Sequence, residues 1–300
     1  LQIAWIGGHA DVVEMLIHLG MNVNINRREV KTPLHFACEH GHLATITKLI
    51  QLGANVNSED DNKLTPLIYA CENGNVACFE KLMIESDADF HFKFDKFSRL
   101  FRYICKFGHV GILNKYVEMG ARIHFDGYHE WSPLHEACAS GHVEMAARLV
   151  DLGVDINCRV YWDRTPLFEA CENGHLEVVN ELIQLGANVF LNSHTRQTPL
   201  HAASAKGHLE VCKRLIYSGC KVNSFTDIGM SPLHEACQNG HIEIVQLLLD
   251  YGAIQYYNAN HSSPAYYANK NGHKQIYEKL IKIDVHGYYP ILIFENRSLR

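Results

Sequence analysis

The dipeptide Gly-His, or a close variant of it, returns along the chain at an almost constant interval. The steps between successive glycines are 33, 33, 34, 33, 33, 33, 33 and 32 residues. These glycines are Gly8, Gly41, Gly74, Gly108, Gly141, Gly174, Gly207, Gly240 and Gly272. A fixed period of this length is typical of solenoids, in which each small repeat buries its apolar face only against its neighbours. The period therefore predicts an array of repeats, rather than one large core, for the 300 residues.

A second motif, Thr-Pro-Leu or Ser-Pro-Leu, runs in phase with the first and marks where a helix begins. It starts at Thr32, Thr65, Ser132, Thr165, Thr198 and Ser231. The hydroxyl oxygen of Thr or Ser caps a helix N-terminus, and Pro fits the first helical position because no N–H is needed there. Helical spacing then places Leu34, Ala37 and Cys38 on the buried face. Gly41 is expected to end this first helix in a left-handed conformation.

A second helix is predicted to begin directly after each Gly-His, with a buried stripe at helical spacing. In one repeat this stripe is predicted to comprise Val143, Ala146, Leu149 and Val150. A third motif, Leu-Gly-Ala-Asn-Val-Asn at Leu52–Asn57 or a relative of it, ends the second helix at its glycine. The chain between this motif and the next Thr-Pro is predicted to form a β-hairpin, although a glycine stands at the hairpin tip only at Gly229.

The three motifs together resemble the ankyrin repeat, and the resemblance covers residues 1–284. It implies an all-α solenoid of stacked helix-turn-helix units with projecting β-hairpin loops. It also implies that the hairpin tips and the first helices line a concave groove that binds other proteins. The expected divisions are a truncated first repeat at 1–26, seven repeats at 27–257, a terminal capping repeat at 258–284, and a tail or the start of a further segment at 285–300.

The pattern fades near residues 94–126, where a degenerate repeat is expected. The segment Arg99–Arg102 stands where the other repeats have Thr-Pro-Leu-His. Four phenylalanines alternate there almost as they would in a strand: Phe90, Phe92, Phe94 and Phe97. Residues 90–107 are therefore either a hinge or partner-binding loop, or a degenerate repeat whose aromatic rings fill the space left by the lost motif.

Composition excludes several classes of partner. A hydrophobic fraction of 47% and a charged fraction of 20% are typical of a folded chain, and a net charge of −6 argues against nucleic acid. The longest apolar runs are too short to span a bilayer, so no membrane partner is predicted either. The chain begins at Leu1, and we expect it to be a segment of a longer, monomeric protein.

Six of the ten cysteines form a ladder with steps of 33, 34, 33, 33 and 66 residues. They are Cys38, Cys71, Cys105, Cys138, Cys171 and Cys237. Packed layers lie about 10 Å apart, whereas a disulfide needs Cα atoms within about 7 Å, so one thiol per repeat predicts no bridges. Free, buried thiols favour a reducing compartment: the cytoplasm, with the nucleus as an alternative.

No pattern in the sequence predicts catalysis, a cofactor or a metal site. Of the 20 histidines, eight belong to Gly-His and four to Thr-Pro-Leu-His, where we expect them to bond to the backbone and fix a loop. Cys-x-x-Cys, His-Glu-x-x-His and Gly-rich phosphate loops do not occur. Thiols buried among apolar residues are inert. The protein is therefore predicted not to be an enzyme.

The resemblance places aromatic residues and Arg, which dominate binding hot spots, on one surface beside several acidic residues. The predicted partner-binding residues are Phe107, Tyr128, His129, Trp131, Tyr161, Trp162, Arg164, Glu136, Glu169, Glu172 and Glu235. This surface predicts a protein or peptide partner that carries basic and apolar residues. The alternative is that Trp131 and Trp162 only pack against neighbouring hairpins.

One modification site is also suggested by resemblance. Ankyrin repeats resemble substrates of an asparagine hydroxylase that favours a Leu eight residues before the Asn, and Asn157 follows Leu149 at that distance. Asp155 adds an acidic residue two positions before it. The alternative is that such asparagines only bond to the hairpin backbone.

The predicted function is that of a scaffold or adaptor that binds one protein through the groove. Two alternatives remain at this point. Ser132–Cys138 and Ser231–Cys237 resemble repeats of ankyrin proteins that carry a SOCS box, which suggests the substrate receptor of a ubiquitin ligase. The array could also regulate a larger enzyme, such as a kinase.

Overall fold

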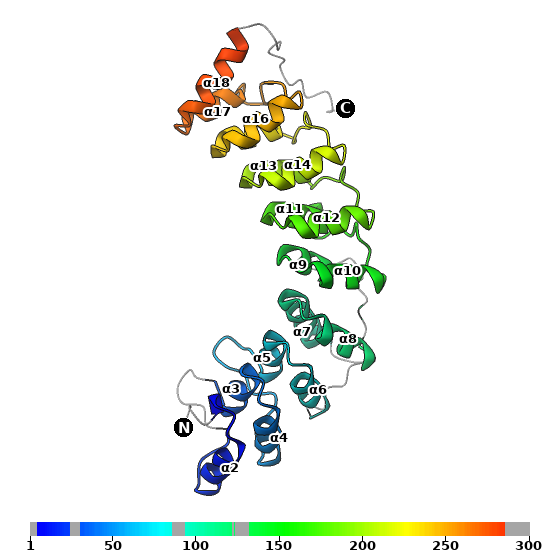
Figure 1. Cartoon of the computed structure of the whole chain (residues 1–300), viewed down its shortest axis with the longest axis vertical. Helices are drawn as coiled ribbons and strands as arrows, with labels where there is room; N and C mark the ends of the chain where they lie inside the picture. The colour runs from blue at the N-terminus through cyan, green and yellow to red at the C-terminus, as the bar shows by residue number, and fades with distance from the viewer. Residues whose placement is uncertain (1–4, 25–30, 86–93, 122, 124–131, 286–300) are drawn as a thin grey trace. The chain divides into compact units, whose positions relative to one another are not determined.

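The computed structural model describes residues 5–24, 31–85, 94–121, 123 and 132–285, with the backbone alone over 94–99 and 284–285. Its contacts divide into two compact units, Leu1–His124 and Phe125–Arg300. In both units the described residues form paired helices, and consecutive pairs pack against each other in chain order (Figure 1). The all-α fold and the stacking of repeats are thereby confirmed.

The described residues of the first unit include the helix α2 followed by three helix pairs. Its helices are α2 (Ala10–His18), α3 (Pro33–Glu39), α4 (Leu43–Gln51), α5 (Pro66–Asn73), α6 (Val76–Glu85), α7 (Phe94–Phe107) and α8 (Val110–Glu118). The first helices α3, α5 and α7 pack in one row, and α2, α4, α6 and α8 pack in a second. Residues 94–107 of the degenerate repeat thus form a helix, so the strand-like reading of Phe94 and Phe97 was wrong. Phe90 and Phe92 lie outside the described residues.

Within residues 132–285, the second unit contains five helix pairs and one short 3₁₀ turn. Its elements are α9 (Pro133–Ala139), α10 (Val143–Asp151), η1 (Tyr161–Asp163), α11 (Pro166–Asn173), α12 (Leu176–Gln184), α13 (Pro199–Lys206), α14 (Leu209–Tyr217), α15 (Pro232–Asn239), α16 (Ile242–Asp250), α17 (Pro264–Lys270) and α18 (Lys274–Val285). The first helices of the pairs pack in one row, and the second helices pack in another.

The predicted Thr and Ser residues stand at the N-caps of the first helices. The side-chain cap forms at Thr165, Thr198 and Ser231, whereas Thr65 and Ser132 make no side-chain cap hydrogen bond. Histidine completes the cap at several helices. At Thr198 the hydroxyl accepts from the backbone N–H of His201, while Nδ1 of His201 accepts from the backbone N–H of Thr198 at 3.2 Å. Ser231 and His234 repeat this reciprocal capping box. Nε2 of His201 donates to the carbonyl of Met230 in the next loop, at 3.0 Å. The predicted backbone role of these histidines is confirmed.

The Gly-His dipeptides join each repeat to the one before it. Nε2 of His208 donates to the carbonyl of Glu172 at 3.1 Å, and Nε2 of His241 donates to the carbonyl of Ala205 at 3.1 Å. The ring of His241 also packs against Gly207, which ends α13 with φ of +86°. A glycine is required here both by the left-handed backbone and by the close approach of the ring.

The core lies between the two rows of helices. Leu34, Ala37 and Cys38 are fully buried, as their spacing predicts. In α10, however, the buried residues are Met145, Ala146 and Leu149, whereas Val143 and Val150 are half-buried. The stripe differs from the prediction because α10 packs against both its own first helix, α9, and the neighbouring second helix, α12. Together these contacts bury the face that carries Met145.

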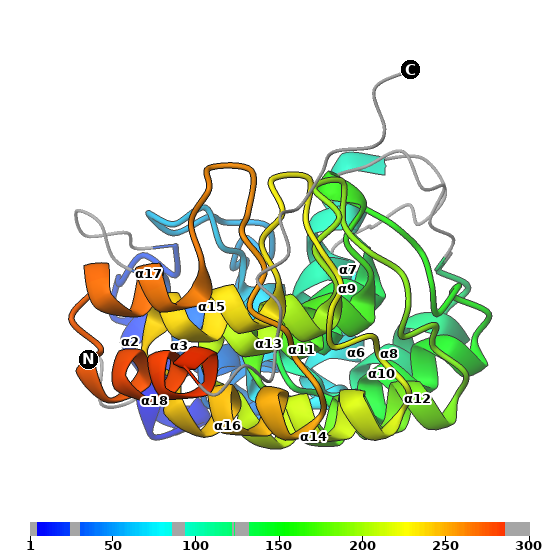
Figure 2. The ribbon, with the colours of Figure 1, turned by 90° about the horizontal axis from the view of Figure 1, so that it is seen from above.

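The loops between pairs project from the same side of the helices in the second unit (Figure 2). They are closed by a recurring pair of hydrogen bonds: in one loop, Ser193 N–H donates to Gln197 O at 2.8 Å and Arg196 N–H donates to Ser193 O at 2.9 Å. Paired strands are not formed among the described residues, where isolated β-bridges occur at Val160 with Arg164 and at Tyr257. The projecting loops therefore end in hairpin-like turns, without the β-ladder that the resemblance implied.

Most of these turns place a residue with a side chain where glycine would be easiest. The fourth turn residue has a left-handed backbone at Lys63 (φ 55°), Arg196 (φ 60°), Gly229 (φ 75°) and His261 (φ 54°). A three-residue hairpin loop commonly ends in this conformation. The turns thus keep the same backbone conformation without a tip glycine, and the residues with side chains at this position are strained.

Replacing Lys63 with glycine should relieve that strain. A left-handed residue with a Cβ costs about 1–2 kcal/mol, and the extra freedom of unfolded glycine returns about 0.5–1 kcal/mol of this. We expect Lys63→Gly to raise the free energy of unfolding by about 0.5–1 kcal/mol in urea titrations. Lys63→Ala is the control, because it removes the same exposed side chain and keeps the strain; an equal gain in both variants would contradict this explanation.

All ten cysteines are free thiols, and nine of them are buried. Burial raises the pKa of the ladder thiols Cys38, Cys71, Cys138, Cys171 and Cys237. The predicted ladder of buried thiols is confirmed, and their lack of reactivity stays a prediction. Among the described residues, the helices are too short or too polar to cross a lipid bilayer.

Candidate functional site

The predicted partner-binding residues are divided between the two units. Phe107 lies at the end of α7 in the first unit, where its ring stacks on Tyr103 with centroids 5.7 Å apart. Tyr128, His129 and Trp131 lie outside the described residues. The remaining predicted residues lie among the described residues of the second unit. They are Glu136, Tyr161, Trp162, Arg164, Glu169, Glu172 and Glu235.

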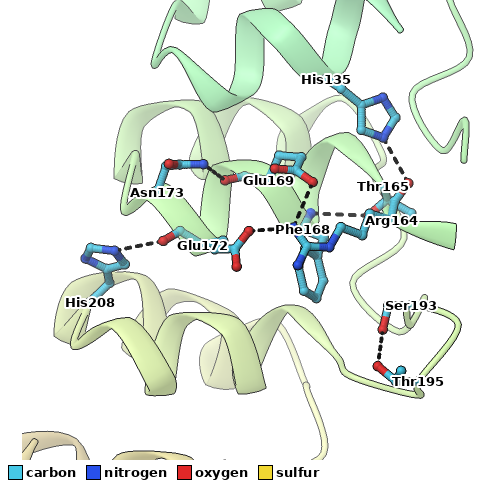
Figure 3. A network of polar contacts seen from close by, with 10 residues as sticks. All are labelled: His135, Arg164, Thr165, Phe168, Glu169, Glu172, Asn173, Ser193, Thr195 and His208. Carbon is cyan, nitrogen blue, oxygen red and sulfur yellow. Dashed lines mark hydrogen bonds and ion pairs between the residues drawn. The ribbon is translucent and has the colours of Figure 1, made fainter. Parts of the chain in front are cut away.

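Arg164 and two glutamates of α11 form a compact ionic cluster (Figure 3). Nη1 of Arg164 donates to Oε2 of Glu172 at 2.7 Å and lies 3.4 Å from Oε1 of Glu169. All three side chains are only partly exposed, which screens their charges less than at an open surface. The structure thus brings these three predicted residues together, and it engages Arg164 within the chain.

The ring of Phe168 packs against the guanidinium group of Arg164. The guanidinium carbon of Arg164 lies 4.7 Å from the centroid of Phe168, a cation–π contact worth on the order of 1 kcal/mol. The carbonyl of Arg164 also accepts from Nε2 of His135 on the preceding first helix, at 2.9 Å (Figure 3). Sequence reasoning missed Phe168, although a signal was present: it stands where other repeats have the His of Thr-Pro-Leu-His.

Glu169 and Glu235 occupy the same position in α11 and α15, two repeats apart, with Ala202 at that position in α13 between them. The helices α11, α13 and α15 pack side by side. Burial raises the pKa of Glu169, although Arg164 partly opposes the shift. Burial also raises the pKa of Glu235, for which the described residues provide no ion pair. This face therefore holds desolvated negative charge beside a buried, small side chain.

Tyr161 and Trp162 form an exposed aromatic tip at η1. Their rings lie 4.9 Å apart at 72°, and both side chains remain more than half exposed. Trp162 and Asp163 have φ of 65° and 56°, so two successive residues adopt the left-handed backbone at a cost of about 1–2 kcal/mol each. The next loop holds this tip, because His194 N–H donates to Trp162 O at 2.7 Å. Such strain is concentrated at binding sites in proteins.

The structure shows how Asn157 is bonded. Its Oδ1 accepts from the backbone N–H of Asn188 in the next repeat at 2.9 Å, and its own N–H donates to Asp155. Asn24 and Asn223 make the same contact with the residue 31 positions later. This agrees with a structural role for the asparagines. Hydroxylation of Asn157 stays a prediction.

Residues that could support other chemistry are not gathered in the parts of the chain that the structure describes. A group of three or more His, Cys, Asp or Glu side chains suited to a metal ion is not found among them. Cys158 is the least buried thiol. Its Sγ forms a hydrogen bond with Ser132 Oγ at 3.4 Å and lies 3.8 Å from Nδ1 of His135. Burial nevertheless raises the pKa of Cys158 to about 11, so it is protonated at neutral pH.

The sequence model of ankyrin repeats (3 copies) matches residues 1–94, 100–193, 154–226 and 200–288. These matches cover far more than half of the chain, on both sides of the degenerate repeat. A search of curated proteins finds no match.

Proposed function

Because the chain belongs to the ankyrin-repeat family, whose repeats are generally protein–protein interaction modules, we propose that it is a binding scaffold. The proposed contact surface in the second unit is formed by the first helices α9, α11, α13 and α15 and by the tip at η1. The proposed partner is a protein or peptide segment with basic and apolar side chains.

The observation that carries this proposal is the desolvated carboxylate of Glu235. A partly buried acid without a cation pays a desolvation penalty that an incoming Lys or Arg side chain would offset. Ala202 stands between Glu235 and Glu169 and is the smallest residue at this position in the three helices. The exposed rings of Tyr161 and Trp162 would supply apolar contact nearby.

The test is binding of a fluorescein-labelled peptide, Leu-Arg-Leu-Lys-Leu-Arg, measured by anisotropy. We expect saturable binding by the unaltered chain and an affinity about fivefold lower for Glu235→Gln, because one partly exposed ion pair contributes about 1 kcal/mol. Glu243→Gln is the control: it removes an exposed acid from the first turn of α16 and should bind normally. Equal affinity of both variants would remove Glu235 from the proposed surface.

The aromatic tip is tested with the same peptide. Trp162→Ala should weaken binding while the melting temperature stays the same, because Trp162 is half exposed. Unchanged binding with unchanged melting would leave the tip as a structural element of the loop.

We also propose that the chain binds rather than catalyses, and that it works in the cytoplasm or nucleus. The raised pKa values of its buried thiols support both points, since protonated thiols are poor nucleophiles and free thiols persist where glutathione keeps them reduced.

A further inference from the structure

A cavity lies between two consecutive loops of the second unit, in the segments that follow α12 and α14. Its volume is about 530 Å³. Its lining includes two aromatic rings, two cations and two small polar residues, namely Phe190, Phe225, Arg196, Lys221, Asn192 and Ser224. None of the residues assigned above to the proposed contact surface lines this cavity.

The two aromatic rings are held differently. Phe225 is half-buried and packs edge-on against Tyr256, with centroids 4.8 Å apart at 90°. Phe190 is 60% exposed, which is unusual for such a large apolar side chain at the rim of a cavity. It stands where the Leu-Gly-Ala-Asn-Val-Asn motif has its final Asn, so the sequence departs from the repeat at this point. Of the two rings that line the cavity, Phe225 is thus held by packing against Tyr256, whereas Phe190 is largely exposed to solvent.

The charge of the cavity is positive. Lys221 is exposed and has no ion pair among the described residues. Arg196 lies 3.9 Å from Asp227, both side chains are about half exposed, and the left-handed backbone at Arg196 fixes where its side chain starts. The described residues that line the cavity include no acid, and Asp227 beside Arg196 lies outside this lining. A chain with a net charge of −6 therefore carries a local positive hollow with apolar walls.

We propose that this cavity binds an acidic peptide in which a carboxylate stands next to a bulky apolar side chain. The apolar side chain would enter between Phe190 and Phe225, and the carboxylate would meet Lys221 and Arg196. A volume of this size takes one or two side chains rather than a folded element.

This inference goes beyond the proposed function, because it assigns a second surface that is opposite in charge to the first. The two surfaces would select opposite peptides on the same unit. One binding event could therefore fail without affecting the other, which makes the two proposals separable by experiment.

The probe is a fluorescein-labelled peptide, Asp-Glu-Leu-Phe-Glu-Asp, titrated with the full chain. We expect saturable binding that weakens as salt is raised, since the ionic part of the contact is screened. Phe190→Ala and Lys221→Glu should each raise the Kd by about tenfold, which corresponds to one lost anchor or one reversed charge. Neither variant should change the affinity for the basic peptide used above.

Matched controls separate the cavity from general surface effects. Tyr217→Ala removes a similarly exposed ring, and Lys274→Glu makes the same charge change, both outside the cavity. Both should bind the acidic peptide normally. The peptides Asn-Gln-Leu-Phe-Gln-Asn and Asp-Glu-Ser-Ser-Glu-Asp should bind poorly, because each lacks one half of the required chemistry. Binding of the amide peptide as tightly as the acidic one, equal loss in the control variants, or no saturable binding would overturn the proposal.

Discussion

Acidification from pH 7 to pH 5 should lower the free energy of unfolding by several kcal/mol. Burial lowers the pKa of His35 in α3. The larger contribution comes from three buried histidines of the other first helices, His135, His201 and His234. Burial lowers the pKa of each of them to about 4, from an ordinary value of 6.5. Hydrogen bonding explains part of why they stay neutral: at His201 and His234, Nδ1 accepts a backbone N–H and has no room for a proton of its own.

Stability falls with pH because the unfolded chain binds protons on these histidines at a higher pH than the folded chain does. Above pH 6.5 these histidines are neutral in both states, so their contribution to folding is fully present. Between pH 6.5 and 4 the unfolded chain binds protons that the folded chain refuses, and stability falls as the pH falls. Each histidine should cost about 2 kcal/mol by pH 5. Glu169 and Glu235, whose folded pKa values burial raises, act in the opposite direction and offset part of this loss.

The measurement is urea unfolding followed by circular dichroism at pH 7, 6 and 5. His201→Gln is the informative variant, because Gln at this position can complete the same Thr-x-x-Gln capping box and does not titrate. We expect it to be less stable than the unaltered chain at pH 7 and to lose less stability on going to pH 5. A slope identical to that of the unaltered chain would show that His201 is not responsible.

Replacing Gly207 with alanine should destabilise the second unit far more than replacing Gly219, although the two glycines flank the same helix, α14. Their backbones are nearly equal, with φ of 86° and 88°. A Cβ on Gly207 would lie 2.6 Å from Cε1 of His241, whereas nothing lies within 4 Å of one on Gly219. We expect a loss of about 1 kcal/mol for Gly219→Ala, from backbone strain alone, and about 3 kcal/mol for Gly207→Ala.

A double-mutant cycle identifies the source of the extra loss. His241→Ala alone removes the ring and its hydrogen bond to Ala205 O, and so destabilises the junction. In the His241→Ala background, Gly207→Ala should cost only about as much as Gly219→Ala does, because the clash has been removed. Additive losses in urea titrations would contradict the close approach of Gly207 and His241.

The fold could be predicted from the sequence because local and repeated signals agree. Thr198 and Pro199 start a helix, and Gly207 ends it, through conformational preferences that need no distant partner. The constant period then predicts which repeats are neighbours in the stack. The choice of Met145 over Val143 for the buried stripe was not predictable in the same way, because it depends on the angle at which α10 meets α12.

The candidate site was predicted less completely than the fold. Glu169, Glu172 and Arg164 were assigned to one surface, but their mutual ion pairs depend on Phe168 supporting the arginine. The cavity around Phe190 was missed, because its lining comes from two consecutive loops and becomes visible only when they lie side by side. A motif shows which residues are usual at a position; it does not show what an unusual residue meets across the gap between two repeats.

The junction between repeats has a consequence for how such arrays change in length. Every junction in the second unit is made with equivalent groups: a histidine Nε2 on one repeat and a backbone carbonyl on the repeat before it. If residues 166–198 were excised, Thr165 would be followed by Pro199, and His208 would face the carbonyl of Ala139 that His175 uses now. Duplication or loss of one whole module therefore leaves matching ends, and evolution can lengthen or shorten the stack without inventing a new contact.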